Sequence, residues 1–266
     1  MPLRITTLAE RPEFAGALWR MATSWPDFML EDPIADLYYP VCHEIYPEYV
    51  LVADDDADPG TLVARALSVP FHWASAIGGA SDGASDGAFD GNGLPDDGWD
   101  GAVRRGWLAR ARGRSLNRVS AVEITVRPDR QGGGLSARML AAMRTNAARL
   151  GFTELLAPVR PTQKHLEPRT PMKEYAFRTR DDGLPYDPWL RVHVRAGGQI
   201  LKVARRSMTI AGTLDEWRRW TGLPFDAPGA VEVPNALVPV HVDLAQDHAV
   251  YVEPNVWVRH PLPPTG

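Results

Sequence analysis

Three consecutive glycines at 132–134 stand where a strand passes into a helix, and no other stretch of the sequence is as well suited to chemistry. Alternating apolar residues from Val122 to Val126 predict a half-buried strand. An apolar 3.6-residue period over 135–150 predicts a helix directly after the glycines. Because glycine has no Cβ, the N–H groups of the turn can point at a ligand, and the helix dipole adds positive charge there. The segment 119–150 is therefore predicted to bind an anion.

The spacing Gln131-x-x-Gly134-x-Ser136 follows a Val-x-Pro sequence that ends at Pro128. This resembles the acyl-CoA loop of the GCN5-related N-acetyltransferases, the GNAT family, in which Gln/Arg-x-x-Gly-x-Gly/Ala follows Val-x-Pro. Ser136 stands where the family has Gly or Ala, and serine is small enough to keep the backbone approach close. The resemblance implies that the CoA pyrophosphate lies on residues 131–136 and that the pantetheine arm pairs with the preceding strand. The acyl-CoA contacts that it implies are Ile124, Val126, Gln131, Gly132, Gly133, Gly134, Leu135 and Ser136.

Two other interpretations of this turn stay open. Gly132-x-Gly134-x-x-Ala137 also satisfies the glycine fingerprint of dinucleotide-binding βαβ units. That fingerprint places its first glycine almost directly after the strand, whereas residues 127–131 intervene here. Its acidic residue, expected ~20 positions later at the end of the next strand, is also misplaced, since Glu154 begins that strand. A glycine-rich turn without a ligand is the second alternative. The strand, Val-x-Pro, Gln-x-x-Gly and amphipathic helix together favour acyl-CoA.

The order of predicted elements agrees with the same family, because two helices and a hairpin precede the glycine loop. The resemblance implies a mixed α/β (α+β) GNAT-like acyl-CoA N-acyltransferase fold. Its central, mostly antiparallel sheet has a V-shaped splay between the two middle strands and is flanked by helices. We expect a single domain over 1–266 with a core of about 1–204. The additions to that core are a flexible Asp/Gly-rich insertion at 75–98, a Pro-rich insertion at 160–186 and elaborated C-terminal strands in 205–266, which would close one edge of the sheet.

The further predicted elements follow from apolar periodicity and from glycine and proline positions. We expect helices over 10–22, 31–46, 99–112, 172–177, 188–197 and 213–223, and strands over 49–53, 62–69, 153–159, 199–204, 238–244 and 250–258.

Glu123 is the candidate general base. Acyl transfer from a thioester to an amine requires a neutral amine, a stabilised oxyanion and a proton for the leaving thiolate. On the resemblance, a backbone N–H near Val126 stabilises the oxyanion. Glu123 lies on the same strand, and a carboxylate buried beside apolar strands binds a proton more readily, as a base must. A structural hydrogen bond or ion pair for Glu123 is an equally open interpretation.

His193 is the candidate acid. In the family, a helix ending in Tyr-x-x-x-Gly-Phe supplies a Tyr that protonates the CoA sulfur. Aligning Gly197 with that glycine puts His193 in place of the Tyr, while Gly198 replaces the Phe. An imidazole can donate a proton near neutral pH. A packed structural histidine is the alternative, and Tyr175 and Tyr186 are further candidates for the acid.

Aromatic residues of the N-terminal helices are candidates for the acceptor pocket, because the first two helices wall off that pocket in GNAT proteins. These residues are Trp25, Phe28, Tyr38 and Tyr39. The basic residues Arg160, Lys164 and His165 are candidates for contact with the CoA 3′-phosphate or with an acidic acceptor.

Composition limits the remaining possibilities. The net charge of −4 gives no reason to expect nucleic acid as a partner, and no apolar run reaches the ~18 residues of a membrane span. The N-terminus lacks the apolar core of a signal peptide. Cys42 is the single cysteine, which fits the reducing cytoplasm, and the histidines show no metal-ligand spacing. We expect no metal and a cytoplasmic location, and a homodimer is left open.

Two classes of function follow. The first is an enzyme, an N-acyltransferase that moves an acyl group, most simply from acetyl-CoA, to an amine of a small molecule or peptide by direct attack. The second is a non-catalytic domain of GNAT-like fold that binds or senses acyl-CoA or pairs with another protein. Sequence does not name the acceptor amine, because acceptor pockets are built from variable loops.

Overall fold

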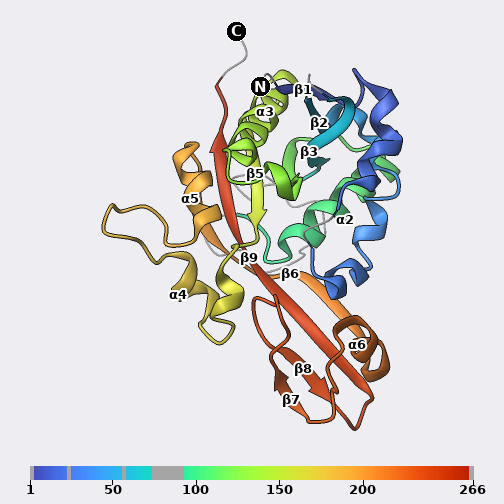
Figure 1. Ribbon diagram of the computed structural model, residues 1–266, viewed down its shortest axis with the longest axis vertical. Coiled ribbons are helices and arrows are strands. Elements are labelled where there is room, and N and C mark those ends of the chain that lie inside the picture. Colours follow the sequence, from blue (N-terminus) through green and yellow to red (C-terminus); the bar gives the residue numbers. More distant parts are fainter. Residues whose placement is uncertain (1–2, 23–24, 56–57, 74–92, 264–266) are drawn as a thin grey trace.

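A nine-stranded sheet forms the centre of the protein, with helices on both faces (Figure 1). The computed structural model describes residues 3–22, 25–55, 58–73 and 93–263. The strands are β1 (Leu3–Thr7), β2 (Val50–Asp55), β3 (Asp58–Phe71), β4 (Arg118–Val126), β5 (Glu154–Val159), β6 (Gln199–Thr213), β7 (Gly229–Val231), β8 (Val240–Asp243) and β9 (His248–Pro261).

Within these described ranges, six α-helices and six 3-10 helices connect the strands. The α-helices are α1 (Cys42–Ile45), α2 (Gly98–Ala111), α3 (Leu135–Arg149), α4 (Met172–Ala176), α5 (Pro188–Arg195) and α6 (Leu214–Thr221). The 3-10 helices are η1 (Pro12–Arg20), η2 (Asp27–Glu31), η3 (Ala35–Leu37), η4 (Pro47–Tyr49), η5 (Pro128–Arg130) and η6 (Lys164–Leu166). Within the described ranges, no helix is both long and apolar enough to span a bilayer.

The expected sheet is confirmed, including its splay. The strand order is β1-β2-β3-β4-β5-β9-β8-β7, and β6 pairs with β9 as well. Every pairing is antiparallel except that of β4 with β5. These two parallel strands share one register pair, Ser120 with Leu156, and pair nowhere else along their length. The C-terminal halves of β4 and β5 therefore leave a wedge-shaped gap in the middle of the sheet.

Alternation along β2 assigns the main helices to opposite faces of the sheet. Leu51 and Ala53 pack in the cluster that holds α3, whereas Val50 and Val52 pack in the cluster that holds α2. Helix α3 buries Met139 and Met143 from its apolar period, as the sequence predicts. The helix ends at Arg149, and the positive φ of 88° at Gly151 lets the chain turn back onto its last carbonyls.

The segment predicted as one helix over 31–46 instead begins at the last residue of η2 and contains two short helical pieces, η3 and α1. Pro33 and Pro40 explain the interruption, because proline has no N–H to give to a helix and clashes with the preceding turn. The strands β1 and β7 were not predicted. They are short, and the exposed and half-buried residues of β7 show no alternation to read.

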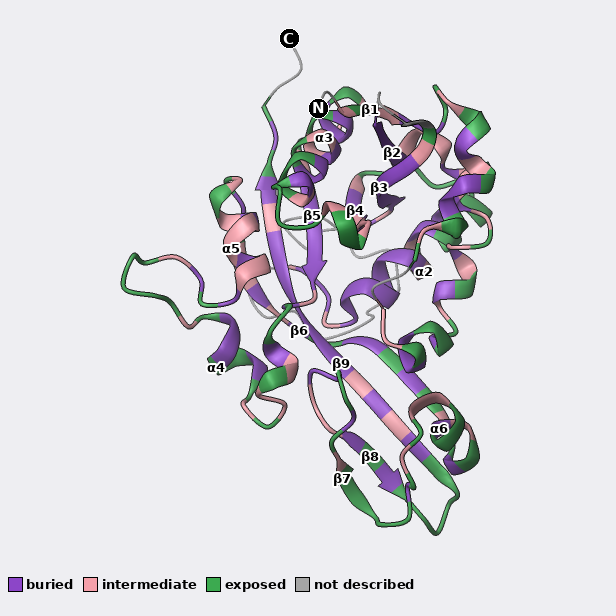
Figure 2. Ribbon diagram, in the orientation of Figure 1, coloured by how far each residue is buried: buried purple, intermediate pink, exposed green. Residues whose placement is uncertain are grey.

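The C-terminal strands differ from the prediction in their position. β9 does not close an edge of the sheet, since it lies between β5 and β6 and pairs with β8 near its start. Its residues are largely buried, whereas those of the short strand β7 are exposed or half-buried (Figure 2). Interior position explains the apolar run Val256–Val258, which faces protein on both sides.

Most of the Asp/Gly-rich segment, residues 74–92, lies outside the described residues. Its end packs against the core. Leu94 is buried. The buried carboxylate of Asp97 accepts hydrogen bonds from Arg104 and Arg105 of α2, so these two guanidinium groups are paired with a carboxylate of the protein itself.

Candidate active site

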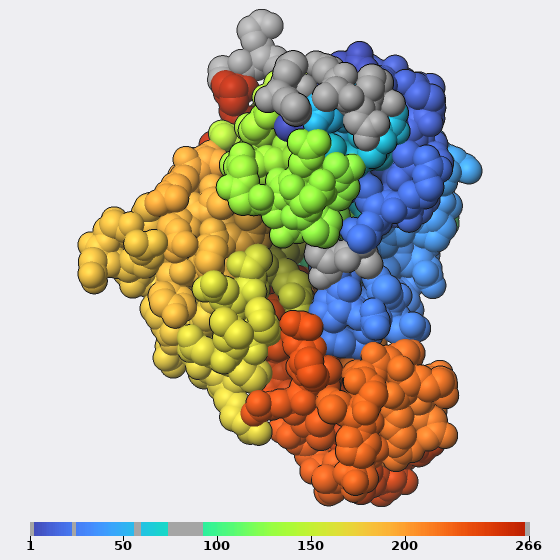
Figure 3. All heavy atoms as spheres, viewed as in Figure 1, coloured from blue at the N-terminus to red at the C-terminus, as the bar shows by residue number. Residues whose placement is uncertain are grey.

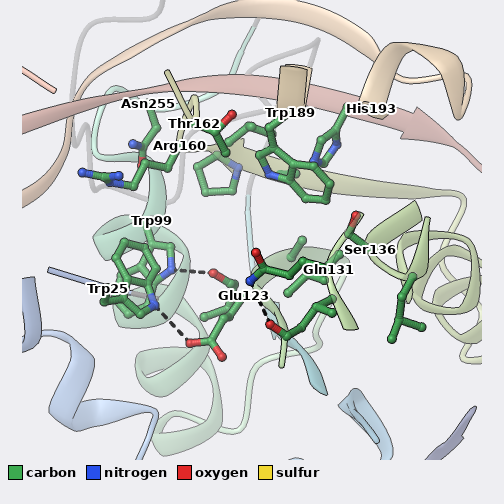
Figure 4. A pocket seen from close by; sticks show the side chains of 18 of the residues that line it. Trp25, Trp99, Glu123, Gln131, Ser136, Arg160, Thr162, Trp189, His193 and Asn255 are labelled. Carbon is green, nitrogen blue, oxygen red and sulfur yellow. Dashed lines mark hydrogen bonds between the residues drawn. The ribbon is translucent and has the colours of Figure 1, made fainter. Parts of the chain in front are cut away.

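A cavity of about 720 Å³ occupies the wedge between β4 and β5. The surface is hollowed between the green start of α3 and the yellow segment after β5 (Figure 3). Ile124 and Val126 line one wall and Val159 lines the other. The cavity joins the glycine turn, at Gln131 and Ser136, to a second end at Arg160, Asn255, Trp25 and Trp99 (Figure 4).

The glycine turn is exposed, as an anion site must be. Gly132 and Gly134 have φ values of 81° and 75°, which favour glycine, and added Cβ atoms there would meet nothing within 4 Å. Gly134 caps the N-terminus of α3, and no side chain fills the capping position. The first N–H groups of α3 have no intrahelical partner, so they are free for a ligand.

The residues predicted to contact acyl-CoA fall into two groups by location. Ile124, Val126, Gln131, Gly132, Leu135 and Ser136 line the cavity, whereas Gly133 and Gly134 lie in the exposed turn beside it. The side-chain amide of Gln131 donates to the carbonyl of Val126 at 3.1 Å and so closes the turn onto the end of β4.

An irregularity in β4 sets the direction of the residues next to the wedge. The register between β3 and β4 slips between Leu67 and Ser68, so Val122 has no partner in β3. Its carbonyl instead accepts the indole N–H of Trp99, at 3.1 Å. Such a bulge bends the strand and re-aims neighbouring side chains, here that of Glu123.

Glu123 is buried and accepts four hydrogen bonds. Oε1 accepts Arg65 Nε at 2.6 Å and Thr125 Oγ1 at 2.8 Å. Oε2 accepts the indole N–H of Trp25 at 3.1 Å and the hydroxyl of Tyr39 at 3.0 Å. The charged partner thus lies on Oε1, while Oε2 has neutral donors only, at the boundary of the cavity (Figure 4).

His193 is buried and lines the same cavity, on α5. The side chain of Asp187 caps that helix and Pro188 starts it, which explains its local formation. His193 Nδ1 lies 2.9 Å from Nε2 of His260, which is on β9. Burial and, next, the neighbouring His260 lower the pKa of His193 to about 3, so its imidazole is neutral at working pH.

Gly198 makes room for this histidine pair. An added Cβ would lie 2.7 Å from the His193 carbonyl oxygen and 2.7 Å from Cε1 of His260. The absence of the family's Phe at this position therefore has a local cause, because the second imidazole occupies the space.

Other candidates from the sequence lie outside the cavity. Phe28 and Tyr38 are core residues, and the Tyr38 hydroxyl donates to the carbonyl of Ser68. Tyr175 is buried against Asp187, and Tyr186 lies on the surface. Three backbone carbonyls, those of Glu167, Pro168 and Leu237, surround the buried ammonium of Lys164, which is therefore not placed to bind a ligand.

The cavity is also lined by residues that sequence reasoning missed. Trp99, Thr162, Trp189, Asn235 and Asn255 all line it. Two of them had a usable signal. Trp189 precedes His193 by one helical turn, and Asn255 interrupts an apolar strand, where asparagine is uncommon. Among the described residues, no three His, Cys, Asp or Glu side chains gather closely enough to hold a metal ion.

A cavity that runs from an exposed glycine turn into a gap between parallel strands is the arrangement that the resemblance to the acyl-CoA-dependent N-acyltransferases implies. The chain belongs to the GNAT family of these enzymes. It is 33% identical over 287 residues to the arginine N-acetyltransferase avaD of Aspergillus versicolor, and the match covers 97% of this chain and 93% of that relative. No protein-family model matches the chain.

Solved structures agree with this fold. The loading GNATL domain of CurA from Lyngbya majuscula matches 98% of this chain and 96% of its own, with a TM-score of 0.54 and 16% identity. The GphF GNAT-like decarboxylase in complex with isobutyryl-CoA matches 99% of this chain and 100% of its own, with a TM-score of 0.50 and 15% identity. At these identities the likeness concerns the fold.

Replacing Gly134 with valine should weaken acetyl-CoA binding at least about tenfold, because the side chain would intrude on the anion site and φ becomes strained by ~1–2 kcal/mol. Gly222 is a matched control, since its φ of 72° is similar and a Cβ there also meets nothing within 4 Å. Titration calorimetry should show normal affinity for Gly222→Val. Equal affinity in both variants would remove the turn from the donor site.

The histidine pair should lower the stability of the folded protein when the pH drops from 6.5 toward 4. Burial lowers the pKa of His260 to about 4 and that of His193 to about 3. The unfolded chain, whose histidines have pKa values of about 6.5, binds the extra protons in this range. Each histidine then costs up to about 1.4 kcal/mol per pH unit. Urea unfolding at pH 7.5 and 5.0 checks this. The free energy of unfolding should change less between the two pH values in His193→Phe than in wild type.

Proposed function

We propose that this enzyme transfers the acetyl group of acetyl-CoA to the α-amine of arginine or a closely related amino acid. The single observation that carries the proposal is the similarity to an arginine N-acetyltransferase over 97% of the chain. The α-amine is the expected nucleophile because a guanidinium stays protonated in water and has no free electron pair to attack with. The continuous cavity supports a direct attack without a covalent enzyme intermediate.

The donor would lie along β4. Its pyrophosphate would bind the N–H groups of residues 131–136, and its pantetheine arm would pair with the open edge of β4 from Ile124 to Val126. This places the thioester in the wedge, near the backbone N–H of Val126, which would stabilise the oxyanion. The lack of pairing between β4 and β5 beyond Ser120 supports this path.

Glu123 is the proposed base. Oε2 would take the amine proton, because its present partners, Trp25 and Tyr39, are neutral donors that can give way, while Arg65 holds Oε1. His193 is proposed to donate a hydrogen bond to the leaving sulfur. Because its imidazole is neutral, it would stabilise the thiolate through an N–H group rather than release a full proton.

A cytoplasmic location and a homodimer stay predictions. The single cysteine supports the first. Size-exclusion chromatography with light scattering measures the second.

A panel of amines tests the function. Purified enzyme with acetyl-CoA should release free CoA with arginine faster than with lysine, leucine or spermidine. Binding of acetyl-CoA without CoA release on any amine would favour the alternative, a non-catalytic domain that binds acyl-CoA.

Glu123→Gln should lower kcat about 10²–10⁴-fold, because the amide cannot accept the amine proton. Tyr39→Phe is the matched control, since it removes one neutral donor from Oε2 and keeps the carboxylate. Steady-state kinetics with saturating acetyl-CoA measure both variants, and calorimetric acetyl-CoA binding verifies that each is folded. A kcat within twofold of wild type in folded Glu123→Gln would leave Glu123 a structural ion pair.

A further inference from the structure

Arg160 lies at the end of the cavity that is farthest from the glycine turn (Figure 4). It directly follows β5. Arg160 lies on the same side of the wedge as Trp25 and Trp99, across the cavity from Gln131 and Ser136 (Figure 4). The guanidinium thus belongs to the acceptor side of the wedge and not to the pyrophosphate site.

A buried network holds this guanidinium in place. Arg160 Nε donates to Oε1 and Oε2 of Glu253, at 3.1 and 3.0 Å, and Nη2 donates to the carbonyl of Asn235 at 2.6 Å. Glu253 has no exposed surface and also accepts the hydroxyl of Tyr251 and the amide of Asn255. A guanidinium has five N–H donors, so these contacts leave donors for a ligand. The side chain keeps 20% of its surface exposed.

The neighbouring amide has a fixed orientation. Glu253 can only accept, so Nδ2 of Asn255 must face it, and the amide oxygen remains for another donor. A fixed guanidinium and an amide oxygen, both lining one end of one cavity, match a carboxylate and an amine on the same small molecule. An α-amino acid carries these groups on one carbon.

We infer that Arg160 binds the α-carboxylate of the acceptor, and that the enzyme thereby selects free amino acids over amines that lack a carboxylate. This inference rests on the proposed function. With the carboxylate at Arg160, the α-amine lies toward Glu123 and the thioester. Arg160 is therefore a specificity-determining residue.

Arginine and agmatine separate this inference from its alternatives, because agmatine is arginine without the carboxylate. Wild type should acetylate arginine with a kcat/KM about 100-fold above that for agmatine, as loss of a hydrogen bond to a charged group predicts. Arginine amide, which lacks the negative charge, should behave like agmatine. Equal kcat/KM for arginine and agmatine in wild type would overturn the inference while leaving amine acetylation intact.

The variant must avoid a buried unpaired charge, because Glu253 would lose its cation in Arg160→Gln alone. The double variant Arg160→Gln/Glu253→Gln replaces the ion pair with two amides. Its KM for arginine should rise, and its preference for arginine over agmatine, measured as the ratio of the two kcat/KM values, should fall toward 1. Arg178→Gln, which breaks a surface ion pair with Glu167, is the control and should keep the preference. An unchanged arginine preference in the folded double variant would make Arg160 purely structural.

Calorimetry in the presence of CoA repeats the comparison without turnover. Tighter binding of arginine than of agmatine in wild type, lost in the double variant, is the expected result. If no amine releases CoA from acetyl-CoA but this binding preference is present, the proposed function fails and the carboxylate site stands. If wild type binds arginine and agmatine with equal affinity, the proposed carboxylate site is wrong.

Discussion

The divergence of β4 from β5 is the constraint on which the site depends. If the two parallel strands stayed paired, the backbone groups of β4 that face β5 would be used in hydrogen bonds to β5, and no room would be left between the strands. Here the pairing stops after Ser120 and Leu156, so the second half of β4 keeps an open edge inside the protein. An open edge is costly unless something covers it, and an extended ligand arm can supply the missing partners. The same gap in the sheet thus creates the cavity and favours an occupant.

Two buried carboxylates lie at the end of that cavity away from the glycine turn, and each is paired with an arginine. Glu123 is held by Arg65, and Glu253 by Arg160. A buried ion pair adds little net stability, because desolvation offsets the attraction, but it fixes geometry strongly. Additional donors, such as Tyr39 and Tyr251, satisfy the remaining lone pairs. The result is a polar end whose groups have few alternative positions before any substrate arrives.

Where the GNAT signature has Tyr and Phe, this chain has His193 and Gly198, and the two differences are linked. His193 on α5 and His260 on β9 share a hydrogen bond within the core, and both are held neutral by burial. Gly198 provides the space, since any side chain there would collide with the pair. A neutral imidazole beside the wedge offers an N–H or a lone pair but carries no charge. In the proposed reaction, His193 would therefore stabilise the leaving CoA thiolate by a hydrogen bond and not by a positive charge.

Local sequence determined the elements whose signals are local. The glycine turn, the apolar period of α3 and the capped start of α5 follow from residues within a few positions of each other, so the turn before α3, the strand that carries Glu123 and the helix that carries His193 were predicted correctly from the sequence alone. Only the tertiary structure decided what those residues touch. Glu123 meets Trp25 and Arg65, and His193 meets His260, across 98, 58 and 67 residues. Arg160 meets Glu253 because β9 pairs with β5, and no local sequence pattern indicates that β9 lies inside the sheet. Chain periodicity reports which face of an element is buried, whereas partner choice depends on sheet order, and sheet order is settled by packing between distant segments.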